Sequence, residues 1–202
     1  MARIDSLADL EALYGTPGPA ALRKVATTIT PAYRRLIEAA PFLALATSGP
    51  EGLDVSPRGD AGGRLVRIVD ERTLILPDRR GNDRIDSLRN VVRDPRVALM
   101  FLIPGWGNAL RVNGRAHVEA DAALLASFAV DGKAPRSVLA IAVEEIYFQC
   151  ARAVVRAGLW SGAAAPAGLP TAGEILAGMT EGEVGGGDYD SGWAARAAAT
   201  LW

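Results

Sequence analysis

Short apolar segments separated by turns follow one another between residues 42 and 143, and they restrict the fold more than any other feature of the chain. Residues 97–104 are the most apolar of these segments, and residues 109–119 alternate between apolar and polar side chains. Such alternation is typical of a strand that buries one face. Segments of the same kind lie at residues 42–47, 53–58, 64–69, 73–76 and 138–143. Strands so short and closely spaced predict an antiparallel barrel or sandwich in a mainly β, α+β fold.

Helical patterns precede these strands. Residues 6–14 place leucines at helical spacing after Ser6, a residue type that caps helices. Pro31 interrupts the helical stretch 20–40, and because Thr30 is also a good N-cap, we expect a new helix to begin there. We assign residues 1–41 to an N-terminal helical segment.

The spacing of the apolar residues becomes helical again after residue 143. This predicts a helix over residues 144–160 with Ile146 and Cys150 on its apolar side, and we therefore interpret Cys150 as a core residue rather than a nucleophile. The helix ends the main domain, which we place at residues 42–160.

Residues 161–202 form a C-terminal extension, which we expect to pack on this domain or on a partner subunit. It begins with a linker at residues 162–170, followed by a helix at residues 171–179. Residues 181–192 are too rich in glycine to predict regular structure, and the alanine-rich tail predicts a helix that ends in Trp202.

Composition argues against several classes of protein. Cys150 is the only cysteine, so intramolecular disulfides are impossible and a reducing compartment is expected. Since His117 is the only histidine, we expect no metal site, and we interpret His117 as a surface or interface residue. The N-terminus lacks the pattern of a signal peptide and no apolar run approaches about 18 residues, so we expect a cytoplasmic protein without a membrane segment.

The charge distribution favours a small anionic ligand. The formal net charge is −1, but residues 58–115 carry 12 arginines against 7 acidic residues. A cationic middle within a nearly neutral chain suits a small anion better than a nucleic acid, which we do not expect as a partner.

The turn after the apolar segment 73–76 is the strongest candidate for that anion site. It carries Arg79, Arg80 and Arg84 and leads into a helical pattern over residues 83–93. A strand, a turn and a helix start direct backbone N–H groups at an anion, and guanidinium groups suit phosphate. The alternative is an ordinary helix start, in which Asp83 is the N-cap and Asp86 its partner in the first turn.

Five motifs carry a family resemblance. They are DVSPRGD at residues 54–60, LPDRRGNDRIDSLRN at 76–90, FLIPG at 101–105, LRVNGRA at 110–116 and YFQCARAVVRAGLW at 147–160. In their order and spacing the chain resembles a bacterial branch of the pyridoxamine 5′-phosphate oxidase-like, FMN-binding split-barrel proteins. The resemblance extends over residues 42–160 and implies a six-stranded Greek-key split barrel, a homodimer, and FMN bound in two clefts at the dimer interface.

The resemblance also implies which residues bind the cofactor. Those expected at the phosphate come from the second strand, the turn before the helix, and the helix itself: Ser56, Arg58, Asn82, Arg84 and Arg89. Those expected near the flavin ring come from the turn after FLIPG and from the C-terminal motif of the other subunit: Trp106, Asn108, Arg156 and Trp160. For Trp106, ring stacking and an interface anchor remain alternatives.

The chain departs from the family pattern in its last motif. Gln149, Arg152 and Ala157 stand where we expect His, Lys and Ser. We also identify no Arg-x-His pair of the kind that true pyridoxamine phosphate oxidases use on their substrate, so vitamin B6 synthesis is not expected. Catalytic residues stay unassigned.

The resemblance leaves several functions open. The first is an FMN-dependent oxidoreductase that acts on an unidentified small molecule, with NADH or NADPH as electron donor. Any nicotinamide would bind transiently, because no G-x-G-x-x-G fingerprint is present. The second is a non-catalytic flavin-binding protein, and the third is a split barrel that binds a deazaflavin or haem, although one histidine disfavours haem.

Overall fold

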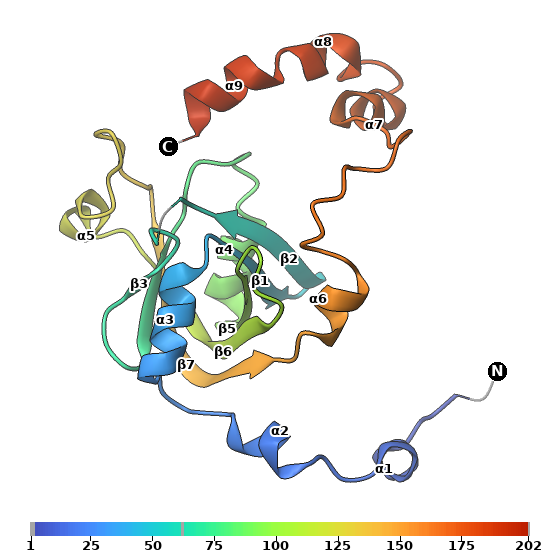
Figure 1. The fold of residues 1–202 in the computed structure, drawn as a ribbon. Coiled ribbons are helices and arrows are strands. Elements are labelled where there is room, and N and C mark those ends of the chain that lie inside the picture. Colours follow the sequence, from blue (N-terminus) through green and yellow to red (C-terminus); the bar gives the residue numbers. More distant parts are fainter. Residues whose placement is uncertain (1–2, 62, 202) are drawn as a thin grey trace.

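Seven strands form one antiparallel sheet in the order β2-β1-β5-β6-β7-β4-β3 (Figure 1). The protein is described by a computed structural model that covers residues 3–61 and 63–201. The strands are β1 (Phe42–Gly49), β2 (Gly52–Gly59), β3 (Arg67–Ile68), β4 (Thr73–Pro77), β5 (Arg96–Leu102), β6 (Ala109–Glu119) and β7 (Val138–Gln149). The predicted α+β class with an antiparallel sheet is confirmed. The seventh strand, beyond the six that the resemblance implies, is accounted for by the two-residue β3 at the end of the sheet.

Alternation along the strands builds the core. Leu43, Leu45 and Thr47 of β1 are buried, whereas the residues between them are half-buried. The inward side chains of β5, β6 and β7 meet those of β1 in a single cluster, which includes Phe101 and Ile146. Because side chains of a strand point alternately to its two faces, the other face of β1, β2 and β5 remains uncovered within one chain.

Gly114 lies at an irregularity of the sheet. The register between β6 and β7 shifts at Asn113 and Gly114, and a Cβ on Gly114 would overlap the carbonyl oxygen of Ala142. Gly114 therefore lies at a bulge where the backbone of β7 approaches too closely for any side chain.

β7 is longer than the sequence predicts. Residues 144–149, assigned to a helix from their spacing, continue β7 and pair with β6, for example Ile146 with Val112. The helical part is limited to α6 (Arg152–Arg156). The prediction of a helix over residues 144–160 is wrong because pairing with a long neighbouring strand outweighs a weak local pattern. Cys150 follows the strand and is exposed, so its assignment to the core is wrong too.

The N-terminal helices agree with the sequence in part, since residues 24–30, within the helical stretch predicted over residues 20–40, are not helical. They are α1 (Leu7–Tyr14), α2 (Pro19–Arg23) and α3 (Pro31–Ala39). Ser6 Oγ accepts the Asp9 N–H, and Thr30 Oγ1 accepts the Tyr33 N–H, so both predicted caps are confirmed. Only α3 enters the core, through Ile37.

α4 (Asp86–Arg93) packs on β1 and β2 and starts three residues later than predicted. Asn90 is buried and donates from Nδ2 to Thr47 Oγ1 at 3.1 Å, which fixes the helix to β1. The N-cap is Ile85 in a left-handed conformation, and no side chain caps the helix. The predicted helix start at Asp83, with Asp83 as N-cap, is therefore wrong.

The C-terminal extension forms α7 (Ala172–Met179), α8 (Gly186–Ser191) and α9 (Trp193–Thr200), whereas α5 (Ala122–Ala126) packs on residues of β4 and β7. The extension lies on the opposite side of the sheet from α1 and α2 (Figure 1). The expectation of irregular structure over residues 181–192 is wrong for α8, because Asp190 accepts bonds from Thr171 and from the Gly173 N–H and so holds α8 against α7. Trp202 lies outside the described residues.

Within the described ranges, every helix is too short or too polar to cross a membrane.

Candidate anion-binding site

The site lies at the seam of the sheet, where β2 and β4 approach each other without pairing. β2 ends one side of the strand order, and β4 lies next to the other end. Two crossed ion pairs bridge the seam: Arg58 Nη1 lies 2.5 Å from Asp78 Oδ1, and Arg79 Nε lies 2.9 Å from Asp60 Oδ2. All four side chains are less than a quarter exposed. Arg79 also donates to the Phe128 carbonyl oxygen.

A cavity of about 630 Å³ opens at this seam. Its walls come from β2, the end of β4, the turn that follows β4, and the first turn of α4. It is lined by polar and charged side chains, among them four arginines (Arg58, Arg79, Arg80 and Arg84) and five aspartates (Asp54, Asp60, Asp78, Asp83 and Asp86).

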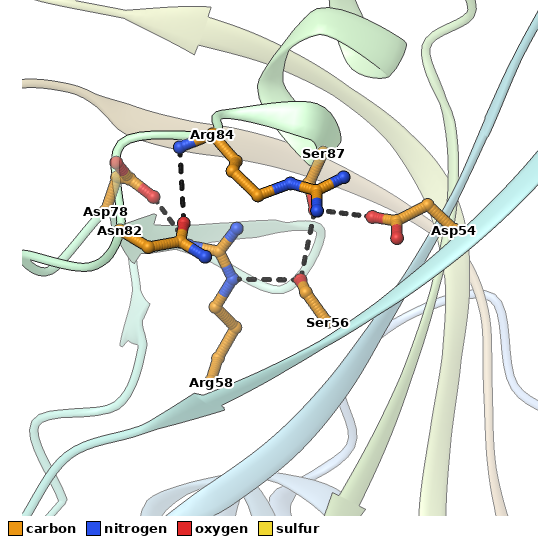
Figure 2. Close-up of polar contacts among 7 residues, drawn as sticks. All are labelled: Asp54, Ser56, Arg58, Asp78, Asn82, Arg84 and Ser87. Carbon is orange, nitrogen blue, oxygen red and sulfur yellow. Dashed lines mark hydrogen bonds and ion pairs between the residues drawn. The ribbon is translucent and has the colours of Figure 1, made fainter. Parts of the chain in front are cut away.

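The inward face of β2 supplies one wall. Asp54, Ser56 and Arg58 alternate along the strand and are all half-buried. Arg58 Nε donates to Ser56 Oγ at 3.2 Å, Ser56 Oγ lies 3.0 Å from Ser87 Oγ, and the Ser87 hydroxyl donates to Asp54 Oδ2 at 3.1 Å (Figure 2).

This network has a fixed direction. A guanidinium can only donate and an ionised carboxylate can only accept. Because the single hydroxyl hydrogen of Ser87 goes to Asp54, Ser56 must be the donor to Ser87. The hydrogen bonds therefore run from Arg58 through Ser56 and Ser87 to Asp54.

The N-terminus of α4 forms the opposite wall. Asp83 and Ile85 both have positive φ, 59° and 52°, so the turn doubles back sharply before the helix. Asp83 pairs with Arg136, and Asp86 pairs with Arg84 at 2.8 Å, so neither carboxylate caps the helix. Asn82 Oδ1 accepts the Arg84 N–H at 3.2 Å (Figure 2). The first residues of the helix therefore line the cavity, and no side chain caps their N–H groups.

The chemistry of these donors suits an anion. Backbone N–H groups at a helix start, two hydroxyl groups, an amide and guanidinium groups are the donors that proteins use for phosphate. Among the described residues that line the cavity, none is a His, Cys, Lys or Tyr. The site can hold an anion, but it offers no side chain that ordinarily titrates near neutral pH.

The structure brings together the four residues expected from the second strand and the turn: Ser56, Arg58, Asn82 and Arg84 all line the cavity. Arg89 is exposed on α4 and does not line it. The residues expected near the flavin ring form a separate group, in which Trp160 Nε1 donates to the Trp106 carbonyl oxygen at 3.0 Å. Asn108 lies half-buried just before β6, and Arg156 is exposed at the end of α6.

Sequence reasoning missed four polar residues of the cavity, Asp54, Asp60, Asp78 and Ser87. Asp54 could have been found, because strand alternation places it on the same face as Ser56 and Arg58. Asp78 and Ser87 gave no such signal, since their roles depend on contacts with residues 20 and 31 positions away.

The histidine lies elsewhere. His117 is exposed on β6 and its Nε2 lies 2.6 Å from Glu119 Oε1, which confirms the surface assignment. The chain does contain one Arg-x-His sequence, Arg115-Ala116-His117, but neither end of it lines the cavity. No cluster of metal-ligating side chains occurs in the described part of the chain.

Comparison with known proteins identifies a family whose model matches this chain. The model of one family, described as pyridoxamine 5′-phosphate oxidase, matches residues 29–150, which is more than half of the chain. A comparison with curated proteins finds no match.

Similar solved structures share this part of the chain. HupZ of Group A Streptococcus is 23% identical, with 68% of this chain and 99% of that chain covered and a TM-score of 0.47. A proposed pyridoxamine 5′-phosphate oxidase of Lactobacillus delbrueckii is 21% identical, with 60% and 95% covered and a TM-score of 0.49. An FAD-binding protein of Mesorhizobium loti is 19% identical, with 61% and 96% covered and a TM-score of 0.40.

Proposed function

The chain belongs to the pyridoxamine 5′-phosphate oxidase family, and from this premise we propose that its cavity binds the phosphate of FMN. We further propose that the sheet forms a Greek-key split barrel and that the protein is a cytoplasmic FMN-dependent oxidoreductase. Its substrate is a small molecule other than pyridoxamine phosphate, and NADH or NADPH is the electron donor.

One observation carries this proposal. The first turn of α4 has no side-chain cap, and its residues Asp86 and Ser87 line a cavity that is also lined by Ser56 and Arg58. An ordinary helix start would satisfy its N–H groups with its own Asp, Asn, Ser or Thr. A chain that instead places Ile85 at the cap, in a conformation unfavourable for a β-branched residue, leaves the donors for a ligand.

The residues of the cavity would divide the work of holding this cofactor. Arg58 and Arg84 would supply charge to the phosphate, Asn82 and the helix start would supply directed hydrogen bonds, and Ser56 would hold the Arg58 guanidinium in place. The flavin, when bound, supplies the redox chemistry, and the protein positions it.

A second copy of the chain would complete the site. Ser56 and Arg58 face the cavity, and the residues that alternate with them on β2 face outward, where Leu53 and Val55 are 86% and 65% exposed. Val55 lies in register with Ala46 and Ala98, and Pro57 with Ala44 and Met100, so a flat surface of small and apolar side chains crosses β2, β1 and β5. Surfaces of this kind mark protein interfaces.

We propose that this outer face of β2, β1 and β5 is the homodimer interface. With the cofactor bound at that interface, Arg156 and Trp160 of the partner subunit would then reach the flavin ring, as the family resemblance implies. Trp106 and Asn108 would contact the ring within the same chain.

Titration with FMN tests the phosphate assignment. Arg58→Ala and Arg84→Ala should each lose about ten- to a hundredfold in affinity, since a hydrogen bond to a charged group is worth about 1.5–3 kcal/mol. Arg93→Ala is the matched control, because it removes the same charge from the far end of α4, where Arg93 pairs with Glu51. Unchanged FMN affinity in folded Arg58→Ala and Arg84→Ala proteins would show that the assignment is wrong.

A non-catalytic flavin-binding protein is the second candidate. It is favoured by the lining of the described cavity, which holds no side chain that ordinarily titrates near neutral pH. Steady-state oxidation of NADH or NADPH with an artificial acceptor separates the two functions, since only the oxidoreductase turns over.

A further inference from the structure

The two ion pairs that bridge the seam differ in what surrounds them. Arg79 is held by Asp60 and by the Phe128 carbonyl oxygen, and its side chain is only 15% exposed. Arg58 is held by Ser56 and Asp78, and both ion pairs line the cavity. They differ in that the Arg79 pair is also tied to the Phe128 carbonyl oxygen, outside the cavity wall, whereas the partners of Arg58 are both side chains of the wall.

Asp78 holds Arg58 as a phosphate would. Its Oδ1 lies 2.5 Å from Arg58 Nη1, the geometry of a charge-assisted hydrogen bond. The backbone N–H of Asp78 donates to the carbonyl oxygen of Ser137, the residue before β7, at 3.0 Å, which fixes the backbone from which this carboxylate extends. An anion held on the same chain has a high effective concentration at Arg58, because it pays no cost of association.

We propose that Asp78 is a built-in competitor for Arg58, which the phosphate of FMN must displace, so that this chain holds FMN as a dissociable ligand. The proposal rests on the proposed function. It adds that the Arg58–Asp78 pair closes the seam when the ligand is absent and opens as the ligand binds, while the Asp60–Arg79 pair stays in place.

The competing interpretation makes the opposite prediction. If Asp78 only positions Arg58, as a carboxylate behind a binding arginine often does, its removal should weaken FMN binding. If Asp78 competes, its removal should strengthen binding. The sign of one change in affinity therefore decides between the two.

The test compares Asp78→Asn with Asp83→Asn. Asp83 also lines the cavity, but it pairs with Arg136 and not with Arg58, so Asp83→Asn removes the same charge without freeing Arg58. The probes are FMN, riboflavin, which lacks the phosphate, and inorganic phosphate. Fluorescence quenching reports the two flavins, and thermal unfolding reports phosphate.

We expect Asp78→Asn to bind FMN roughly three- to tenfold more tightly than the unchanged protein, the effect of removing a partly exposed ion pair. Asp78→Asn should also bind inorganic phosphate more tightly, and its affinity for riboflavin should be unchanged. Asp83→Asn should increase the affinity for FMN by a smaller factor. Weaker or equal FMN binding to Asp78→Asn overturns the proposal, as does an equal gain in Asp83→Asn. Asp78→Ser carries the same test if Asp78→Asn does not fold.

The outcome also separates this inference from the proposed function. If FMN binds to neither protein but phosphate binds Asp78→Asn more tightly, the flavin assignment fails and the competition stands. If neither FMN nor phosphate binds, both are overturned.

Discussion

Ser87 joins the two walls of the cavity. It is 3% exposed, lies in the first turn of α4, and contacts Ser56 and Asp54 of β2. Because the hydrogen bonds run in one direction from Arg58 to Asp54, the loss of this hydroxyl leaves both Ser56 without an acceptor and Asp54 without a donor. The loss of the Ser87 hydroxyl should therefore affect both the stability of the fold and the wall of the proposed ligand site.

Ser87→Ala should lower the free energy of unfolding by about 1–2 kcal/mol, the cost of leaving a half-buried carboxylate without its donor. Urea denaturation of the single variants and of the double variant with Asp54→Ala measures this in a double-mutant cycle. We expect the double variant to be less destabilised than the sum of the two single variants, since Asp54→Ala removes the carboxylate that Ser87→Ala leaves unpaired. Additive effects would contradict the network.

The start of α4 shows a conflict between local preference and structure. Ile85 has φ 52° and is 46% exposed, so little burial compensates for its conformation. A left-handed conformation costs an L-residue with a Cβ about 1–2 kcal/mol, and Asn tolerates it better. Such strain is common where a backbone is shaped for a ligand.

Ile85→Asn should therefore raise the free energy of unfolding by about 1 kcal/mol. FMN affinity should not rise, because an asparagine side chain at the N-cap can bond the N–H groups that the proposed function leaves for the phosphate. Asp83→Asn is the control. Asp83 also has a positive φ, but an aspartate already tolerates this conformation, so the free energy of unfolding of Asp83→Asn should be close to that of the unchanged protein. A loss of stability in Ile85→Asn would mean that the exposed isoleucine makes a contact in the assembled protein that the single chain does not show.

The same helix shows how far the sequence predicts the elements. Strand alternation and the caps at Ser6 and Thr30 depend on neighbours in the sequence, and they were predicted correctly. The start of α4 was not, because Asp83 has the right side chain for a cap but pairs with Arg136, 53 residues away. The prediction for residues 144–149 failed for a related reason. Pairing with β6, and not the spacing of their own apolar side chains, decides their structure.

The site divides in the same way. Ser56, Arg58, Asn82 and Arg84 were identified through motifs, and the structure places all four in one cavity. Asp78 was not identified, since a carboxylate in a phosphate site argues against the site until its partner Arg58 is known. The sequence does not show that the end of β2 lies beside the end of β4, which places residues 58 and 60 against residues 78 and 79.

At the scale of the whole molecule, the single chain leaves much apolar surface uncovered. The outer face of β2 exposes Leu53 and Val55, and α1 exposes Leu7 and Leu13, which are 75% and 67% exposed. α7–α9 lie away from the sheet, where Trp193 is 63% exposed (Figure 1). An edge strand with an apolar face is a liability unless another surface covers it. We therefore expect the dimer to cover β2, and the two terminal segments to add to its interface.

Val55→Asp should convert the dimer to a monomer. Val55 is 65% exposed in one chain, so the substitution should change the stability of the isolated fold by no more than about 0.5 kcal/mol, yet it places a charge in the centre of the proposed interface. Val92→Asp is the matched control, since Val92 is 76% exposed on α4, outside the outer face of β2, β1 and β5. Sedimentation velocity should give half the mass for Val55→Asp and the full mass for Val92→Asp. If both variants keep the mass of the unchanged protein, β2 is not at the interface, and the proposal that this face completes the cofactor site is wrong.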